Sequence, residues 1–171
     1  MCNEQLISRE ARGELAALLV QVRRLEPDEW QSYRALRLRA LEQAPDAFSS
    51  VHADEQRLHE QDWRERIATR AIFAAADAGL VGGVERESGK VGLVSLWVAP
   101  EARSRGLGSA LVEAVLAWAE DEGAEEVTLW VNESNVGAIA LYERAGFAAT
   151  GARKELRAGV MEIELALELP R

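Results

Sequence analysis

A basic, glycine-containing turn stands beyond the middle of the chain, in the run Arg103-Ser104-Arg105-Gly106-Leu107-Gly108. It follows an apolar run from Leu93 to Val98 and opens an amphipathic stretch from Leu107 to Glu122. Glycines carry no side chain that would keep ligand oxygens away from backbone N–H groups, and a helix N-terminus adds unpaired donors and partial positive charge. The two arginines add full positive charge. The pattern therefore predicts a strand, a turn and a helix N-terminus that together bind a phosphorylated ligand.

Two familiar phosphate loops do not fit this turn. A Walker loop requires Gly-x-x-x-x-Gly-Lys-Ser/Thr, which occurs nowhere in the chain. The Rossmann fingerprint requires a third glycine three positions after Gly108, where the chain has Leu111, and it normally lies in a first βαβ unit. The remaining pattern, Arg103-x-x-Gly106-x-Gly108, also occurs in ordinary strand-to-helix connections, so a second signal is needed to interpret it.

The second signal follows the apolar run from Val127 to Val131. It reads Asn135-x-x-Ala138-x-x-Leu141-Tyr142-x-x-x-Gly146-Phe147. Together with Val98-Ala99-Pro100 and the glycine turn, in this order and at this spacing, it resembles the GNAT family of acyl-CoA N-acyltransferases. The motifs span about Leu93 to Phe147, and a weaker N-terminal resemblance begins near Val20 and includes residues 34–41.

The resemblance implies an α/β fold of the α+β kind, with a mixed, mostly antiparallel seven-stranded sheet flanked by about four helices. Two neighbouring strands, here ending near Val98 and Val131, would splay apart and hold acyl-CoA in the gap. Residues 18–171 would form this single domain, after a leader or short helix at 1–17. The implied activity is that of an N-acetyltransferase, which moves an acetyl group directly from acetyl-CoA to a primary amine of a small molecule and needs no metal.

The resemblance also assigns tasks to residues. Backbone N–H groups from Arg105 to Ser109 would hold the pyrophosphate, with the arginine side chains near the outer phosphates and Ser104 as a small turn residue. The backbone of residues 96–98 would pair with the pantetheine arm and direct an N–H group at the acyl oxygen, as in an oxyanion hole. The implied cofactor-binding residues are Leu96, Trp97, Val98, Arg103, Ser104, Arg105, Gly106, Leu107, Gly108, Ser109, Asn135 and Tyr142.

Two residues of the second motif have alternative interpretations. Tyr142 matches the family position that donates a proton to the CoA thiolate, and a phenol with a pKa of about 10 suits that catalytic role. The alternative is a tyrosine that only packs on its helix. Asn135 matches a position that contacts the cofactor, and it could equally cap the helix that begins there.

The general base stays open. Relatives that acetylate protein N-termini often carry a glutamate on the strand before Asn135, at the position where this chain has Trp130. That departure disfavours a ribosomal-protein-type assignment, and the tryptophan could instead wall the acceptor pocket. Glu85 could act through water, although strand glutamates usually face solvent, and His52 or His59 could reach the acceptor, although surface histidines are commoner. A bound amine could also lose its proton directly to solvent.

The composition limits the classes of partner. The 171 residues, 48% of them apolar, suffice for one domain with its own core, and the net charge of −9 argues against a nucleic-acid partner. Acidity suits a cationic amine, although it mostly serves solubility. The single Cys2 leaves no internal disulfide or zinc cluster, no apolar run approaches 18 residues, and the start lacks signal-peptide character. We therefore expect a cytoplasmic protein without a membrane partner, and the alternating final strand could pair across a homodimer.

Periodicity and helix breakers place the elements that must position these residues. We expect strands at 20–25, 71–76, 80–87, 90–98, 127–131 and 161–169, and helices at about 30–43, 53–69 (broken near 59), 107–122 and 135–145, with a further short helix or loose leader at 8–19. The middle three strands read as an antiparallel meander. Asp28 would cap the first long helix, Gly123 would end the third, and the final strand would turn an acidic face to water.

Two other functions remain open from the sequence. Because no base can be named, the chain could be a non-catalytic module that senses acyl-CoA. It could also be a protein or peptide N-acetyltransferase, since an acidic groove would suit a lysine-rich substrate. The acceptor itself is not readable, because the first two helices and the last two strands shape its pocket and their side chains follow no known code.

Overall fold

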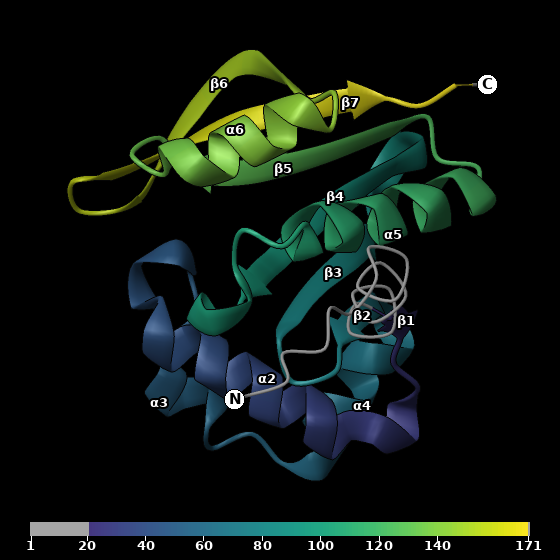
Figure 1. Ribbon diagram of the computed structural model, residues 1–171, viewed down its shortest axis with the longest axis vertical. Helices are drawn as coiled ribbons and strands as arrows, with labels where there is room; N and C mark the ends of the chain where they lie inside the picture. Colours follow the sequence, from purple (N-terminus) through teal and green to yellow (C-terminus); the bar gives the residue numbers. More distant parts are fainter. Residues whose placement is uncertain (1–20, 171) are drawn as a thin grey trace, which may run out of the picture.

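The computed structural model describes residues 21–170, apart from the Ser88 side chain, and shows a seven-stranded sheet covered by helices (Figure 1). The strands run in the order β1-β2-β3-β4-β5-β7-β6. Neighbouring strands are antiparallel except for β4 and β5, which are parallel. The strands are β1 (Val22–Arg24), β2 (Ala71–Ala75), β3 (Gly79–Glu85), β4 (Lys90–Val98), β5 (Glu126–Asn132), β6 (Ala148–Arg157) and β7 (Val160–Glu168). The expected mixed, mostly antiparallel sheet is therefore confirmed.

Five α-helices accompany the sheet in the described part of the chain. They are α2 (Trp30–Gln43), α3 (His52–Glu55), α4 (Glu60–Thr69), α5 (Leu107–Asp121) and α6 (Val136–Arg144). The predicted break near His59 separates α3 from α4, and α2 ends just before Pro45, as expected. The leader or short helix predicted within residues 1–19 lies outside the described residues.

The prediction that Asp28 caps α2 is wrong. Pro27–Glu29 form a short 3-10 helix, so Asp28 lies inside this turn and not at the residue before α2. Glu29 closes the turn instead, because its carboxylate accepts a 3.0 Å hydrogen bond from the Glu26 N–H. A hydrogen bond from Arg23 lowers the pKa of Glu29 to about 2. The proline suits the first position of this 3-10 turn, and α2 then begins at Trp30, as the sequence predicts.

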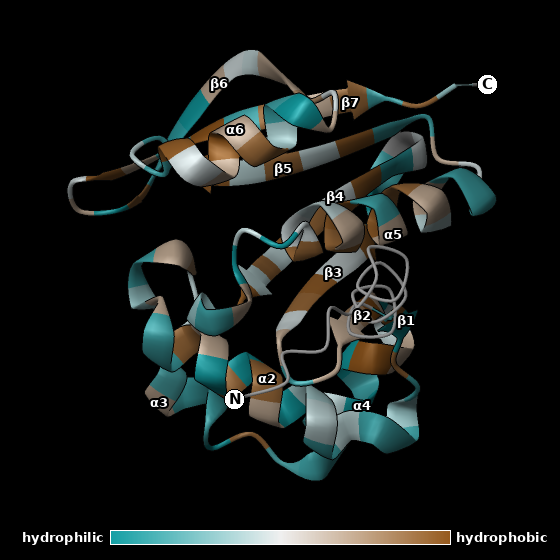
Figure 2. Ribbon diagram, viewed as in Figure 1, coloured by the Kyte–Doolittle hydropathy of each residue, from teal (hydrophilic) through white to brown (hydrophobic). Residues whose placement is uncertain are grey.

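The core is divided between the two faces of the sheet. Phe73 on β2 faces the cluster that contains α5 and α6, whereas its neighbour Ile72 faces the cluster that contains α2 and α4. This alternation follows from the two-residue period of a strand and explains why β2 is apolar throughout. Figure 2 shows the apolar residues on the central strands and on α5, with polar residues over much of α4.

Helix α5 is fixed against the sheet by large side chains on one face. Leu111, Val115 and Trp118 are buried, as their helical spacing predicts. The Trp118 ring lies so close to Gly83 on β3 that a Cβ added there would be 2.3 Å from a ring carbon. Gly123 ends the helix region with φ +72°, as expected for a left-handed residue after a helix. This packing sets the position of the α5 N-terminus beside β4.

Candidate active site

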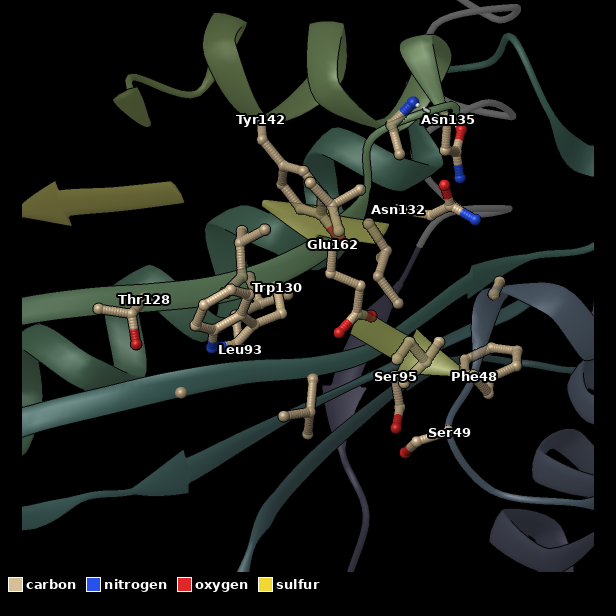
Figure 3. A pocket seen from close by; sticks show the side chains of 18 of the residues that line it. Phe48, Ser49, Leu93, Ser95, Thr128, Trp130, Asn132, Asn135, Tyr142 and Glu162 are labelled. Atoms are coloured by element: carbon tan, nitrogen blue, oxygen red, sulfur yellow. Dashed lines mark hydrogen bonds between the residues drawn. The ribbon is translucent and has the colours of Figure 1, made fainter. Parts of the chain in front are cut away.

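Strands β4 and β5 separate soon after they begin to pair. Their parallel register covers only Lys90 to Gly92 of β4 against Glu126 to Thr128 of β5. Beyond this point the two strands run on without pairing with each other, so part of each backbone edge is free. A cavity of about 530 Å³ opens there, lined by residues 92–96 of β4 and 128–132 of β5 (Figure 3). The splayed strand pair expected from the sequence is confirmed.

A bulge in β4 changes the direction of its side chains at this gap. The register with β3 shifts between Leu80 and Gly82, so that Ser95 and Leu96 are both inserted opposite one residue, and Ser95 has φ +61°. As a result Leu93 and Leu96 pack against the same core cluster although they are three residues apart. A bulge redirects the local backbone as well as the side chains. It therefore places a non-standard backbone segment at the wall of the cavity.

A buried ion pair holds this bulge. The Arg37 guanidinium binds both carboxylate oxygens of Glu55 at 3.0 Å and donates a 3.1 Å hydrogen bond to Ser95 Oγ. Arg66 adds a second ion pair to Glu55 at 3.1 Å. Burial raises the pKa of the Glu55 carboxyl, but the two arginines outweigh it and leave that pKa below its usual value. Helix α2 is thereby tied to the bulge of β4 through charged groups.

The glycine turn leads into an uncapped helix. Ser104 and Gly106 both have left-handed backbones, with φ +61° and +80°, and no side chain caps the N-terminus of α5. The first backbone bond of this helix runs from the Ala110 N–H to the Gly106 carbonyl at 3.0 Å. The N–H groups of residues 107–109 precede that bond, so they are the unpaired donors of a helix N-terminus. The turn therefore has the backbone geometry expected of an anion site.

The two glycines of the turn differ in their surroundings. A Cβ at Gly106 would meet no atom within 4 Å, whereas a Cβ at Gly108 would lie 2.6 Å from a terminal carbon of Leu141 on α6. Gly106 thus borders open space, and Gly108 allows α5 and α6 to approach each other. Arg103 donates through Nε to the Val98 carbonyl at 3.1 Å, and Arg105 is exposed. Both arginine residues are exposed, and they stand just before the N-terminus of α5.

Helix α6 brings two predicted residues to the cavity. Asn135 caps the helix by accepting a 3.1 Å hydrogen bond from the Ala138 N–H, and it also lines the cavity. Tyr142 points into the cavity from α6 and packs edge-on against Phe147 at 5.8 Å between ring centres (Figure 3). Tyr142 is 6% exposed, and burial raises the pKa of its phenol above the usual value. The capping interpretation of Asn135 is therefore correct, and it is compatible with a place in the site.

Other predicted residues lie at the edge of the site or away from it. Leu96 lines the cavity, but the Trp97 side chain is buried in the cluster on the α2 side, where Arg39 stacks over it at 5.3 Å. Any role of Trp97 in the cavity therefore belongs to its backbone. Glu85, His52 and His59 are not among the residues that line the cavity, and Glu85 is exposed. His59 instead forms a capping box with Asp62 at the start of α4.

Sequence reasoning missed one acidic residue of the cavity. Glu162 on β7 was expected on a solvent-facing strand surface, but it is 8% exposed and lines the cavity. It is the register partner of Asn132 on β5, so the two side chains lie on the same face of the sheet. Trp130 also lines the cavity (Figure 3), and Lys154, another lining residue, forms an ion pair with Glu162. The alternation of the strand was visible in the sequence, but the pairing that encloses this face was not.

Within residues 21–170 no group of three or more histidine, cysteine, aspartate or glutamate side chains is arranged to hold a metal ion. None of the helices in this range combines the length and apolar character needed to cross a membrane.

Comparison with known proteins identifies relatives of this chain. A mycothiol acetyltransferase of Salinispora tropica is 36% identical over 143 residues, which are 78% of this chain and 45% of the relative. The chain spans less than half the length of the first curated relatives it matches. A GNAT-family acetyltransferase from Streptococcus pneumoniae has the same fold, with a TM-score of 0.73, 20% identity, and coverage of 87% of this chain and 98% of that one.

A second solved structure has a ligand. The YncA putative acetyltransferase of Salmonella typhimurium, solved with its cofactor acetyl-CoA, has a TM-score of 0.71 at 15% identity and covers 88% of this chain and 94% of its own. The profile of the "Acetyltransferase (GNAT) family" matches residues 25–147, well over half of the chain. These residues include the glycine turn, the splayed strands and Tyr142, so the chain belongs to the GNAT acetyltransferase family.

Proposed function

We propose that this protein is an N-acetyltransferase that moves an acetyl group from acetyl-CoA to a primary amine of a small molecule. The observation that carries the proposal is the open gap between β4 and β5, which lies beside an uncapped helix N-terminus and contains a buried tyrosine. Acetyl-CoA supplies the activated acetyl group as a thioester. The residues of this chain then have three tasks, which are to hold the diphosphate, to polarise the carbonyl and to move protons.

The first task falls to the turn from Arg103 to Ser109. The backbone N–H groups of residues 105–109 would bind the diphosphate at the positive end of α5, and the open space at Gly106 leaves room for it. Arg103 and Arg105 add charge at the outer side of the turn. Gly108 contributes indirectly, because its missing side chain lets α6 pack close to this helix N-terminus.

The second task falls to the bulged segment of β4. An extended ligand arm can pair with a free strand edge through backbone hydrogen bonds, and the unpaired edge of β4 at residues 96–98 is available for this. At the bulge the Leu96 backbone N–H is our candidate donor to the oxygen on which negative charge develops. A fixed donor of this kind stabilises the transition state more than the ground state.

The third task is assigned to Tyr142. The phenol is protonated at neutral pH, as a general acid must be before it acts, and we assign it the proton that a departing thiolate takes up. Burial raises its pKa and makes it a weaker acid until negative charge develops beside it. Tyr142 lines the cavity, where a ligand would meet it. Asn135 lies at the start of the same helix and would orient the cofactor arm from the other side.

The acceptor is proposed to be a small molecule. A cavity of about 530 Å³ is within the range of roughly 300–1,000 Å³ in which small-molecule sites fall. The curated relatives named mycothiol acetyltransferase support an acceptor of this size, although the chain spans less than half of their length. Trp130, at a position where some family members have a glutamate, forms a wall of the acceptor side.

A matched pair of glycine variants tests the diphosphate site. Gly106 and Gly123 lie at opposite ends of α5, both have positive φ, and a Cβ at either would meet no protein atom within 4 Å. Both Gly→Ala variants should therefore lose about 1–2 kcal/mol of stability from left-handed backbone strain. Only Gly106→Ala should weaken CoA binding in calorimetry, by about tenfold or more, since only there does the added methyl group meet a ligand.

Turnover is followed by thiol release from acetyl-CoA with a panel of small amines and lysine-rich peptides. The expected result is release with small amines. Absence of CoA binding by the folded protein, or equal CoA affinity of the two glycine variants, would count against the proposal. CoA binding without transfer to any acceptor would favour a sensor, and transfer to peptides alone would favour a protein acetyltransferase.

A further inference from the structure

We propose that Glu162 and the face of Trp130 form the subsite for the acceptor's ammonium group, and that the Lys154 ammonium occupies this subsite until the acceptor displaces it. The inference rests on the proposed acetyltransferase function and specifies its acceptor as a primary amine that arrives protonated. It also assigns a destination for the first proton that the amine loses.

The carboxylate of Glu162 is the enclosed negative charge of the acceptor side. Glu162 is 8% exposed, and its carboxylate points into the cavity from β7 (Figure 3). Its ion pair is with Lys154, at 3.6 Å between Nζ and Oε2. A carboxylate shielded from water gains more from a close cation than a solvated one does. At 3.6 Å this ion pair is long, so a cation that comes closer to the carboxylate would interact with it more strongly.

Trp130 supplies the second element of an ammonium site. The Lys154 Nζ lies 4.1 Å from the centre of the Trp130 ring, within the range for attraction between a cation and an aromatic face. The same ammonium therefore interacts with both an aromatic ring and a carboxylate that line one cavity. These are the two groups that recognise a ligand ammonium, and in this structure a lysine of the chain itself fills the position.

Lys154 is free to leave. It lies on β6, which pairs only with β7 at the edge of the sheet, and its side chain is 48% exposed. Partly exposed ion pairs contribute little to stability, so water can replace the interactions of the lysine at small loss. When an acceptor ammonium enters, the carboxylate keeps a cationic partner and the lysine moves to solvent. The exchange therefore avoids leaving an unpaired buried charge.

The other cations of the cavity are already engaged or lie elsewhere. Arg37 is held by both oxygens of Glu55 and by Ser95. The Arg86 guanidinium packs over Gly92, at the end of the cavity where β4 and β5 still pair. Among the described residues that line the cavity, Lys154 is thus the cation that an acceptor would replace.

The subsite also accounts for proton movement. An ammonium cannot attack a carbonyl, so an N–H bond must break first. Its proton passes to the Glu162 carboxylate and the nitrogen keeps the electron pair that forms the new C–N bond. Glu162 then releases this proton to solvent at the open side of the cavity. In total two protons leave the nitrogen, one to solvent through Glu162 and one that balances the proton given by Tyr142 to the departing sulfur.

Binding of a simple ammonium to the full chain without CoA tests the subsite directly. The indole N–H signals of the five tryptophans are followed by NMR during titration with benzylammonium, and Trp130→Phe assigns the signal of Trp130. We expect that signal to shift saturably with benzylammonium and not with the neutral benzyl alcohol. Glu162→Gln should weaken the ammonium about tenfold, which is the loss of one charge-assisted interaction.

Two pairs of variants, Glu162→Gln with Glu164→Gln and Lys154→Gln with Lys154→Arg, separate an effect on ammonium binding from a general effect on the structure. Glu164→Gln changes the next acidic residue on the same face of β7, whose carboxylate accepts a hydrogen bond from Thr150 at 2.9 Å, and it should alter affinity less than about twofold. Lys154→Gln removes the internal competitor and should tighten benzylammonium several-fold. Lys154→Arg keeps the charge and should stay near the parent value.

The outcomes are decisive in both directions. Equal effects of Glu162→Gln and Glu164→Gln, or no saturable shift of the Trp130 signal, would overturn the subsite. Weaker or unchanged binding in Lys154→Gln would overturn the displacement. Calorimetry with CoA on the same samples tests the proposed acetyltransferase function separately. A protein that binds benzylammonium at Trp130 but does not bind CoA would refute the acetyltransferase function and leave the ammonium subsite standing. In turnover, Glu162→Gln should raise KM for the amine and lower kcat, with CoA affinity retained.

Discussion

The two sides of the cavity are built in different ways. On the side proposed for the cofactor, the strand edge, the turn and the helix N-terminus come from one continuous segment, residues 93–109, and offer mainly backbone groups. On the acceptor side, the lining comes from the loop at 47–49, from β5, and from the β6–β7 hairpin, and offers mainly side chains. A site made of backbone requires particular glycines at fixed spacing, whereas a site made of side chains requires only that distant segments meet.

The electrostatics of the two sides differ as well. Arg103 and Arg105 are exposed at the turn, where they add to a helix dipole, while Glu162 is enclosed in the cavity. The protein carries a net charge of −9, so the positive turn stands out against its surroundings. Residues 103–109 are not among those that line the cavity, so the positive turn lies outside it, whereas Glu162 lies within it. Breaking each side separately should therefore affect different ligands.

The largest effect is expected where the two sides meet, at Tyr142. Tyr142→Phe removes the proposed proton donor but keeps the ring that packs on Phe147. General acid catalysis contributes roughly 10²–10⁴-fold, so kcat should fall by about that factor while CoA affinity stays within about twofold. Thiol release and calorimetry measure the two quantities. Tyr33, the chain's other tyrosine, is buried in the opposite cluster, so Tyr33→Phe is the matched control. Full activity of Tyr142→Phe would remove the phenol from the mechanism.

The next effect is on stability, at the ion pair beneath the acceptor side. Arg37→Leu leaves the buried Glu55 with Arg66 as its remaining ion-pair partner and deprives Ser95 of its hydrogen bond. Breaking a buried pair costs about 3–5 kcal/mol, and Arg66 should keep the loss near the lower value. Urea unfolding measures it.

A residue on the same helix gives the control for this loss. Arg39 forms a partly exposed ion pair with Glu101, donates a 3.0 Å hydrogen bond to the Asp77 carbonyl and stacks over Trp97. Arg39→Leu should therefore cost about 1–2 kcal/mol, less than Arg37→Leu. The double change of Arg37 and Glu55 to leucine should recover part of the loss. Similar losses for Arg37→Leu and Arg39→Leu would show that the buried pair has no special structural role.

The cofactor side could be predicted from sequence because its physics is local. Leu107 begins α5 and Lys90–Val98 form β4, as expected, since the breakers Pro100 and Gly106 stand beside strong apolar runs. The uncapped helix follows from a glycine at the N-cap position. Asn135 was given two interpretations, and the structure shows that its side chain caps the helix and also lines the cavity.

The acceptor side could not be predicted because its physics depends on register. Glu162 and Glu164 look alike in the sequence, and only the pairing of β7 with β5 places the first beside Asn132 in the cavity. Strand β6 has no clear alternation of apolar and polar residues and is mostly exposed, so the sequence does not indicate where it begins and ends. Arg37 sits in an amphipathic helix among other arginines, and nothing local distinguishes it from Arg34 or Arg39.

A smaller effect should separate the arginines of the turn from arginines elsewhere. Arg105→Gln removes one charge-assisted interaction with the diphosphate, so CoA affinity should fall about tenfold at low salt, and less as salt rises. Arg57 is exposed in the connection between α3 and α4, and Arg57→Gln preserves the same change in net charge. Calorimetry at two salt concentrations measures both. Equal losses for the two variants would mean that only the overall field of the protein attracts CoA.

The smallest effect is expected in the acid stability of the acceptor side. Burial raises the pKa of Glu55, whereas Arg37 and Arg66 lower it. The lowering is the larger of these two partly cancelling effects, so the pKa lies below its usual value. A lowered pKa means that the carboxylate stabilises the fold above the pKa of the unfolded chain, near 4.3, and that this contribution disappears as pH falls through the folded value. The stability difference between the parent and Glu55→Gln should therefore be constant near neutral pH and shrink below about pH 4. A difference that grows on acidification would contradict the sign of the shift and would place the dominant influence in burial.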